Sequence, residues 1–322
     1  MPLLTSTYRA PWWLPGGHAQ TLGPRLLRRA PPVNYRRERI ATPDGDFLDL
    51  DWSKCGGARV VVILHGLEGC SRSRYVLGFV HALNGAGWDC VVLNFRGCGG
   101  ELNRACRLYH SGETDDLHSV VGHVLAQSDV VEVALLGVSL GGNVLLKYLG
   151  EQGDGIDRHI GRAMALSVPC DLASSAAQLA RPTNRLYMRY FLRSLARKAQ
   201  GKAAQFPGRF STEGLGRMVT FAEFDGQVTA PLHGFAGADD YWRQCSSRLF
   251  VPRIRLPTLL LSARNDPFLT PECFPEEEAK ASTCFHLEAP TTGGHVGFSS
   301  ARLGGPTWSE RRAVEFLGGA MP

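Results

Sequence analysis

Residues 132–149 read EVALLGVSLGGNVLLKYL, a largely apolar run, a short glycine-rich segment and a second apolar run. The residues from Glu132 to Val138 predict a buried strand, and those from Gly142 to Leu149 predict a helix. Between them lies the pattern Gly-x-Ser-x-Gly, with Ser139 at its centre. We therefore expect a sharp strand-to-helix turn that exposes the Ser139 hydroxyl, flanked by glycines that let strand and helix approach closely. An ordinary turn serine is the alternative interpretation.

The alternation of strand and helix continues on both sides of this segment. The other expected strands and helices are, in chain order, Val60–Leu64, Tyr75–Leu83, Asp89–Phe95, Asp116–Leu125, Ala163–Val168, Thr258–Ser262, Cys284–Leu287 and Trp308–Leu317. Strands that alternate with helices pair in parallel, and continuous Val, Leu and Ile runs indicate strands buried on both faces. The predicted fold class is therefore α/β, with a mostly parallel central sheet and helices on both faces.

The alternation is interrupted between residues 171 and 256, where helix-like segments replace the strands. We predict that residues 171–256 form a helical cap, inserted between two parts of one core, 36–170 and 257–322. Residues 1–35 are predicted to be an N-terminal extension that packs on this core. Within residues 39–52, the turn sequence Pro-Asp-Gly-Asp predicts a hairpin at the start of the core.

Length and composition limit the class of protein. The chain has 322 residues, of which 44% are hydrophobic, as expected for an enzyme-sized globular protein. No apolar run approaches the roughly 18 residues of a membrane-spanning helix, and the N-terminus lacks the apolar segment of a secretory signal peptide. We therefore expect a cytoplasmic protein. The nine cysteines show neither metal-ligand spacing nor a disulfide pattern.

The net charge of +5 is unevenly distributed, since nine Lys or Arg residues and one acidic residue lie between Arg181 and Arg217. One basic segment on an otherwise mildly acidic chain argues against nucleic-acid binding. The arginines that recur every fourth residue, and so predict a basic stripe along a helix, are Arg181, Arg185, Arg189, Arg193 and Arg197. We favour a solvated face whose arginine stems cover apolar surface. The alternative is a peripheral contact with a lipid surface.

A serine nucleophile requires a general base and a carboxylate, in the chain order Ser, Asp or Glu, His. His295 follows a Thr-Thr-Gly-Gly loop after the last expected strand, and we predict it to be the base. His286 lies within that strand and is expected to be structural. Asp266 follows the strand 258–262 at its carboxyl end, where catalytic loops gather, and is the predicted acid. Asp171, which follows the preceding strand, is the alternative.

The developing oxyanion of an acyl transfer requires two backbone N–H donors. We predict that these are the N–H groups of Leu140, directly after the nucleophile, and of Leu67, in the turn after the first central strand. His65 in that turn is expected to be structural. The predicted acyl transfer implies no organic cofactor, and the missing phosphate-binding glycine loops argue against nucleotide use.

The polar residues His110, Glu113, Asp115 and Asp116 suggest either a metal site or the start of a helix. We favour the second interpretation, in which Thr114, Asp115 and Asp116 cap the helix and place negative charge beside its free N–H groups. No metal site is therefore predicted.

Longer motifs make the chain similar to the YheT-like family of α/β-fold hydrolases. They are WLPGGHAQT at 13–21, HGLEGCSRSRY at 65–75, NFRGCGGELN at 94–103, YHSGETDDL at 109–117, GVSLGGN at 137–143 and GGHVGF at 293–298. The resemblance implies the α/β-hydrolase fold, a triad of Ser139, Asp266 and His295, and esterase or lipase-like activity on acyl esters. Gly99 and Gly226 depart from the family pattern, and neither belongs to the implied triad.

The sequence thus predicts a serine hydrolase that cleaves carboxylic esters of short to medium or lipid-like acyl chains through an acyl-enzyme. Its expected partner is a small acyl ester or lipid. An acyltransferase that uses the same acyl-enzyme is the alternative. A non-catalytic binding protein on the same fold is a third hypothesis, disfavoured because all three triad positions are filled.

Overall fold

The computed structural model describes residues 2–301 and 304–319. Within this part of the chain, nine strands form a sheet in the order β1-β9-β8-β7-β6-β4-β5-β3-β2. The strands are β1 (Leu3–Leu4), β2 (Arg36–Ala41), β3 (Phe47–Ser53), β4 (Arg59–Leu64), β5 (Asp89–Asn94), β6 (Glu132–Val138), β7 (Ile160–Leu166), β8 (Thr258–Leu261) and β9 (Phe285–Glu288). The hairpin β2–β3 is antiparallel, as predicted, and so is the pair β3–β5. All other neighbouring strands are parallel.

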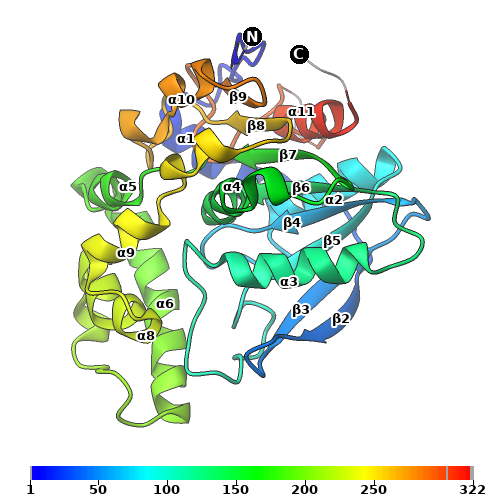
Figure 1. Ribbon diagram of the computed structural model, residues 1–322. Helices are drawn as coiled ribbons and strands as arrows, with labels where there is room; N and C mark the ends of the chain where they lie inside the picture. The colour runs from blue at the N-terminus through cyan, green and yellow to red at the C-terminus, as the bar shows by residue number, and fades with distance from the viewer. Residues whose placement is uncertain (1, 302–303, 320–322) are drawn as a thin grey trace.

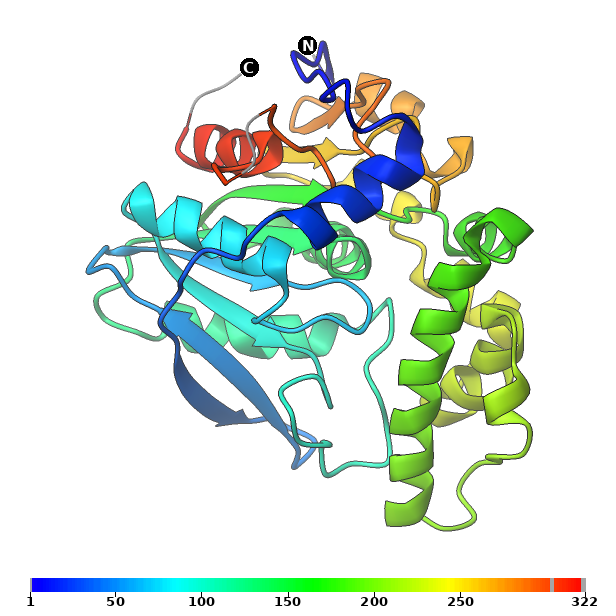
Figure 2. The same cartoon turned by 180° about the vertical axis from the view of Figure 1, so that it is seen from behind.

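Helices cover both faces of the sheet because the central strands are apolar on both sides. In β4, Val60, Val62 and Leu64 face one hydrophobic cluster, while Val61 and Ile63 face the other, as the two-residue period of a strand requires. The first cluster lies under α3 (Thr114–Leu125) and α4 (Leu140–Gln152), which are in front of the sheet in Figure 1. The second lies under α2 (Arg74–Gly85) and α11 (Trp308–Leu317), seen in front in Figure 2. The predicted fold class is confirmed.

Between β7 and β8 the chain leaves the sheet and forms a helical bundle at its side, drawn in green to yellow in Figure 1. The α-helices of this insertion are α5 (Leu172–Leu179), α6 (Arg185–Gln205), α7 (Phe221–Phe224), α8 (Ala230–His233) and α9 (Ala238–Cys245). The longest, α6, buries Met188, Leu192, Leu195 and Ala199 on one face, spaced as a helix requires. The cap and extension boundaries at residues 35, 170 and 256 stay predictions.

Two elements near the N-terminus were not expected. The short strand β1 joins the sheet edge beside β9, and α1 (Gly16–Leu27) packs along the core. A strand of two residues carries no periodicity, and α1 contains three glycines and Pro24, which lower its helix propensity. Contacts with the rest of the fold, rather than the local sequence, therefore stabilise β1 and α1. The short helix α10 (Glu276–Lys280) precedes β9.

Two local predictions were wrong. Arg181 does not lie on the basic helix, because a 3₁₀ turn with Pro182 at its start separates it from α6, which begins at Arg185. Thr114 does not cap α3: Glu113 is the N-cap residue, and its side chain makes no capping hydrogen bond. Asp115 and Asp116 do lie in the first turn of α3.

Candidate active site

Ser139 stands at the turn from β6 to α4, with φ +53° and ψ −119°. A non-glycine residue rarely adopts such angles, and the surrounding structure must hold it there. Its N–H donates a 2.8 Å hydrogen bond to the Leu166 carbonyl of β7. Gly141 explains the second glycine of the motif, because a Cβ atom there would lie 2.6 Å from the carbonyl oxygens of Leu64 and His65. The predicted strand-turn-helix geometry is therefore confirmed.

The structure brings Ser139, His295 and Asp266 together. His295 Nε2 lies 3.0 Å from Ser139 Oγ, and His295 Nδ1 lies 2.8 Å from Asp266 Oδ2. The Asp266 carboxylate is fully buried and the His295 side chain is 11% exposed. This arrangement places a nucleophile, a base and a carboxylate in one hydrogen-bonded chain. Their catalytic role stays a prediction.

The alternative residues take other positions. Asp171 is the N-cap of α5, where its carboxylate accepts a 2.8 Å hydrogen bond from the Ser174 N–H. His286 lies within β9, as predicted. Asp266 is therefore the carboxylate that meets His295.

The turn after β4 lies directly beside the nucleophile. A Cβ atom on Gly66 would stand 3.1 Å from Ser139 Cβ, and Leu67 and Leu140 line the same cavity as Ser139. Within residues 2–301 and 304–319, the Leu67 N–H donates to no protein acceptor. The Leu140 N–H belongs to the first turn of α4, whose N–H groups have no partner within the helix. Their role as oxyanion donors stays a prediction.

His65 holds this turn from inside the core. Its Nδ1 lies 2.8 Å from the Gly66 carbonyl oxygen, and its Nε2 accepts a 3.2 Å hydrogen bond from the Phe95 N–H. Burial lowers the pKa of His65 to about 4. The ring is therefore neutral near pH 7, with one nitrogen donating and the other accepting, which agrees with a structural role.

A cavity of about 110 Å³ extends from Ser139 beneath the insertion. Most of its wall is apolar, and the insertion supplies much of that wall through Leu172, Ala176, Leu179, Phe191, Leu195, Phe221, Phe224 and Trp242. Phe268, two residues after Asp266, lies on the His295 ring with centroids 4.3 Å apart. The site can therefore take an apolar group next to the nucleophile.

The N-terminal helix α1 holds the loops that carry Asp266 and His295. Gln20 is buried, and its Oε1 accepts hydrogen bonds from Asn265 Nδ2 at 2.9 Å and from the Gly293 N–H at 2.8 Å. Thr21 Oγ1 accepts from the His295 N–H at 2.9 Å. Gln20 and Thr21 lie in the family motif WLPGGHAQT at 13–21, for which no role was predicted. The resemblance of this motif to the family was the signal that could have pointed to them.

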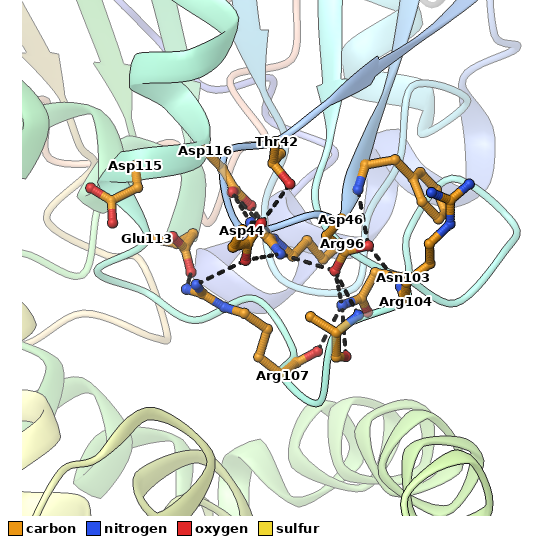
Figure 3. Close-up of polar contacts among 12 residues, drawn as sticks. Thr42, Asp44, Asp46, Arg96, Asn103, Arg104, Arg107, Glu113, Asp115 and Asp116 are labelled. Atoms are coloured by element: carbon orange, nitrogen blue, oxygen red, sulfur yellow. Dashed lines mark hydrogen bonds and ion pairs between the residues drawn. The ribbon is translucent and has the colours of Figure 1, made fainter.

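The loop between β5 and α3, which contributes Tyr109, His110 and Ser111 to the cavity, is fixed by a buried arginine (Figure 3). Arg96 is 3% exposed and binds three carboxylates, those of Asp44, Asp46 and Asp116, at 2.7, 2.9 and 2.6 Å. Figure 3 shows Asp115 pointing away from this cluster. Asp116 therefore helps to fix this loop by its ion pair with Arg96, in addition to placing negative charge in the first turn of α3.

His110, Glu113 and His233 offer ligand atoms within 4.8 Å of one another. His110 Nδ1, however, accepts the Gly112 N–H at 3.1 Å, whereas a metal-bound histidine usually donates through its other nitrogen. Glu113 forms an ion pair with Arg107. Burial lowers the pKa of His110, and lowers that of His233 to about 3. These contacts favour a neutral pair of imidazoles that packs α8 against the core.

No α-helix in the described residues is long and apolar enough to cross a membrane. The expected cytoplasmic location stays a prediction.

Comparison with known proteins agrees with this architecture. A family model for the alpha/beta hydrolase fold matches residues 59–299. Among solved structures, the esterase Pf2001 of Pyrococcus furiosus aligns with 90% of this chain and 97% of its own, with a TM-score of 0.59 and 19% identity. The latter likeness concerns the fold alone. The chain is an α/β hydrolase.

Two relatives give a narrower assignment. The Escherichia coli (strain K12) protein named "Putative esterase YheT" is 37% identical over 93% of this chain and 89% of its own length. "Phospholipase ABHD3" of Mus musculus is 31% identical over 92% of this chain and 74% of its own. The chain belongs to the YheT-like family of α/β-fold hydrolases, as the motifs predicted.

Proposed function

We propose that this carboxylic ester hydrolase cleaves acyl esters through an acyl-enzyme on Ser139, with His295 as general base and Asp266 as its orienting carboxylate. The observation that carries the proposal is the hydrogen-bonded chain from Ser139 Oγ through His295 to Asp266. Relatives named as an esterase and as a phospholipase support ester chemistry.

In the first half-reaction, His295 Nε2 takes the proton of Ser139 as Oγ attacks the ester carbonyl carbon. The Leu67 and Leu140 N–H groups receive the resulting oxyanion, a role worth about 10²- to 10³-fold in rate for one donor. The tetrahedral intermediate then breaks its bond to the alcohol oxygen, which takes the proton from His295. Water attacks the acyl-enzyme in the same way, and the acid leaves as Ser139 regains its proton.

We infer that the helical insertion, residues 171–256, is a cap that shapes the acyl site. Its aromatic and aliphatic side chains form much of the cavity wall. Lys198, the cationic side chain among those lining the cavity, is already paired with Glu68. A wall of this kind favours an uncharged acyl chain of short to medium length, or part of a lipid, over a charged one.

An acyl-chain-length series of activated esters tests this function. The proposal expects turnover that depends on chain length and that falls at least about 10³-fold in Ser139→Ala. A flat profile that Ser139→Ala does not change would contradict it. Product analysis with added alcohol separates hydrolysis from acyl transfer, because an acyltransferase forms a new ester from the same acyl-enzyme.

We propose further that a face shared by α1 and α6 makes peripheral contact with anionic lipid. Leu26, Leu186 and Tyr190 are 70%, 74% and 46% exposed, and the Arg25 guanidinium lies 4.7 Å from the centroid of the Tyr190 ring. The exposed arginines of the neighbouring α6 surface are Arg185, Arg189, Arg193 and Arg197. They form no ion pair within the described part of the chain. Apolar side chains among unpaired arginines suit a lipid interface.

Vesicle sedimentation tests this contact. Binding to phosphatidylglycerol-containing vesicles should exceed binding to pure phosphatidylcholine vesicles and should weaken with salt. The double variant Arg185→Gln/Arg189→Gln should bind less, while Arg209→Gln/Arg217→Gln serves as a charge-matched control. Equal binding by wild type and both double variants would contradict the contact.

A further inference from the structure

We propose that Glu68 is a positioning residue that ties the helical insertion to the turn carrying the Leu67 N–H, an inference that rests on the esterase mechanism proposed above. Glu68 directly follows Leu67. Its carboxylate is 2% exposed. The mechanism assigns no proton transfer to this buried acid, so its presence beside the oxyanion donor calls for another role.

Donors from both the core and the insertion hold the Glu68 carboxylate. Tyr109 Oη donates to Oε1 at 2.7 Å, and Lys198 Nζ donates to the same oxygen at 2.8 Å. Ser194 Oγ donates to Oε2. Ser194 and Lys198 are four residues apart on α6, and therefore lie on the same helix face. One carboxylate thus joins α6 of the insertion to the core.

The backbone of Glu68 is also held in place. The Gly69 N–H donates to the Gly66 carbonyl at 3.0 Å, so Leu67 and Glu68 are the central residues of a tight turn. Glu68 has φ +56°, a left-handed conformation that costs a non-glycine residue roughly 1–3 kcal/mol. The Glu68 N–H donates to Tyr109 Oη at 2.8 Å. Contacts of the side chain and the N–H therefore maintain a turn that glutamate does not favour by itself.

The charge on Lys198 is maintained despite its burial. Desolvation would lower the pKa of Lys198, but its contacts with Cys98 and Glu68 more than offset this effect and raise it. Its ammonium group also lies 5.1 Å from the centroid of the Tyr109 ring. Removing one partner of a buried ion pair leaves the other without compensation. The pair therefore constrains the turn more strongly than an exposed pair such as Glu277–Lys280, whose side chains are 78% and 50% exposed.

The consequence for catalysis is specific. A donor stabilises an oxyanion only if it is held in position before the reaction. Glu68 holds the turn that contains the Leu67 N–H. Its loss should therefore weaken binding of the transition state and leave binding of the ground-state substrate almost unchanged.

The experiment compares wild type with Glu68→Gln, which keeps the shape, and Glu68→Gly, which relieves the backbone strain but removes the side chain. Glu277→Gln is the control, since it removes an exposed Glu–Lys pair. For each variant we would measure kcat and KM for an activated ester. We would also measure the inhibition constants of a trifluoromethyl ketone, whose adduct with a serine is an oxyanion, and of the matching methyl ketone.

Both Glu68 variants should lose at least about tenfold in kcat and in trifluoromethyl ketone affinity. KM and methyl ketone affinity should stay within about twofold, because these report ground-state binding. Unchanged kcat in a folded Glu68→Gln variant would overturn the proposal, and so would equal losses for both ketones. If Glu68→Gln does not fold, Ser194→Ala carries the same test from the insertion side.

This result is separable from the proposed function. Hydrolysis by wild type that is lost in Ser139→Ala, together with normal kinetics in both Glu68 variants, contradicts only the role of Glu68. Hydrolysis that persists in Ser139→Ala contradicts the esterase mechanism instead.

Discussion

Asn143 Nδ2 donates a 2.8 Å hydrogen bond to the carbonyl of Cys245 at the end of α9, so the helix that starts directly after the nucleophile is bonded to the insertion. The same nitrogen donates to the Ser111 carbonyl at 2.8 Å, and Oδ1 accepts the Ser247 N–H at 3.0 Å. Asn143 is fully buried.

Asn143→Ala should therefore lower the free energy of unfolding by about 3 kcal/mol, because it leaves buried partners without hydrogen bonds. Urea denaturation measures the change. Gln244→Ala, on the exposed side of α9, should change it by less than about 0.5 kcal/mol. Equal stability of wild type and Asn143→Ala would show that these bonds do not hold the insertion to the core.

Arg96→Lys should destabilise the fold by about 3 kcal/mol or more, since a single ammonium group cannot bind Asp44, Asp46 and Asp116 as the guanidinium does. The matched control is Arg243→Lys, because Arg243 forms an exposed pair with Asp240 and is itself 72% exposed. That exposed pair should contribute little to stability, because solvent screens it. Similar losses in the two variants would contradict a dominant role for the Arg96 cluster.

Burial lowers the pKa of His233 from the usual 6.5 to about 3. The unfolded chain therefore binds a proton below about pH 6.5 that the folded protein does not. The contribution of neutral His233 to the free energy of unfolding is fully present above pH 6.5 and is lost as the pH falls toward 3. In His233→Asn, the slope of unfolding free energy against pH should be smaller by up to about 1.4 kcal/mol per pH unit in this range.

Urea denaturation between pH 4.5 and 7.5 checks this slope. His159→Asn is the control, because the His159 side chain is 44% exposed. Superimposable slopes for His233→Asn and wild type would contradict the prediction.

Gln20→Ala should lower kcat about tenfold or more with a smaller change in KM, because small misplacements of catalytic groups reduce rate strongly. Gln20 joins Asn265, next to the predicted acid, to Gly293, two residues before the predicted base. Gln20→Glu loses the amide that donates to the Leu14 carbonyl at 2.9 Å but keeps an acceptor oxygen for Asn265 and Gly293, and it should retain more activity than the alanine variant. Ester kinetics of the two variants measure the effect, and the reverse order of activity would argue against this role.

The parts of the site that the sequence predicted depend on local pattern. Ser139 is flanked by a strand and a helix that its neighbours predict, and the positions of Asp266 and His295 follow from the ends of their strands. Parallel strands bring their carboxyl ends to one edge, so residues far apart in the chain can be expected together. The predicted oxyanion donors, the N–H groups of Leu67 and Leu140, were inferred from the same topology.

The parts that the sequence did not predict are pairings between side chains from distant elements. Nothing in the periodicity of α6 indicates that Lys198 meets Glu68, and no pattern links Gln20 to the loop of His295. Such contacts depend on how the insertion and α1 dock on the core. The shape of the cavity depends on the same docking. The sequence therefore predicted only a range for the length of the substrate's acyl chain.

The most direct test of the central claim is intact-mass analysis after reaction with a fluorophosphonate, which bonds covalently to an activated serine. Peptide mapping then locates the adduct. The account predicts one adduct on Ser139, rapid in wild type, at least about 10³-fold slower in His295→Asn and absent in Ser139→Ala. Labelling that persists in Ser139→Ala, or a wild type that does not react, would contradict it.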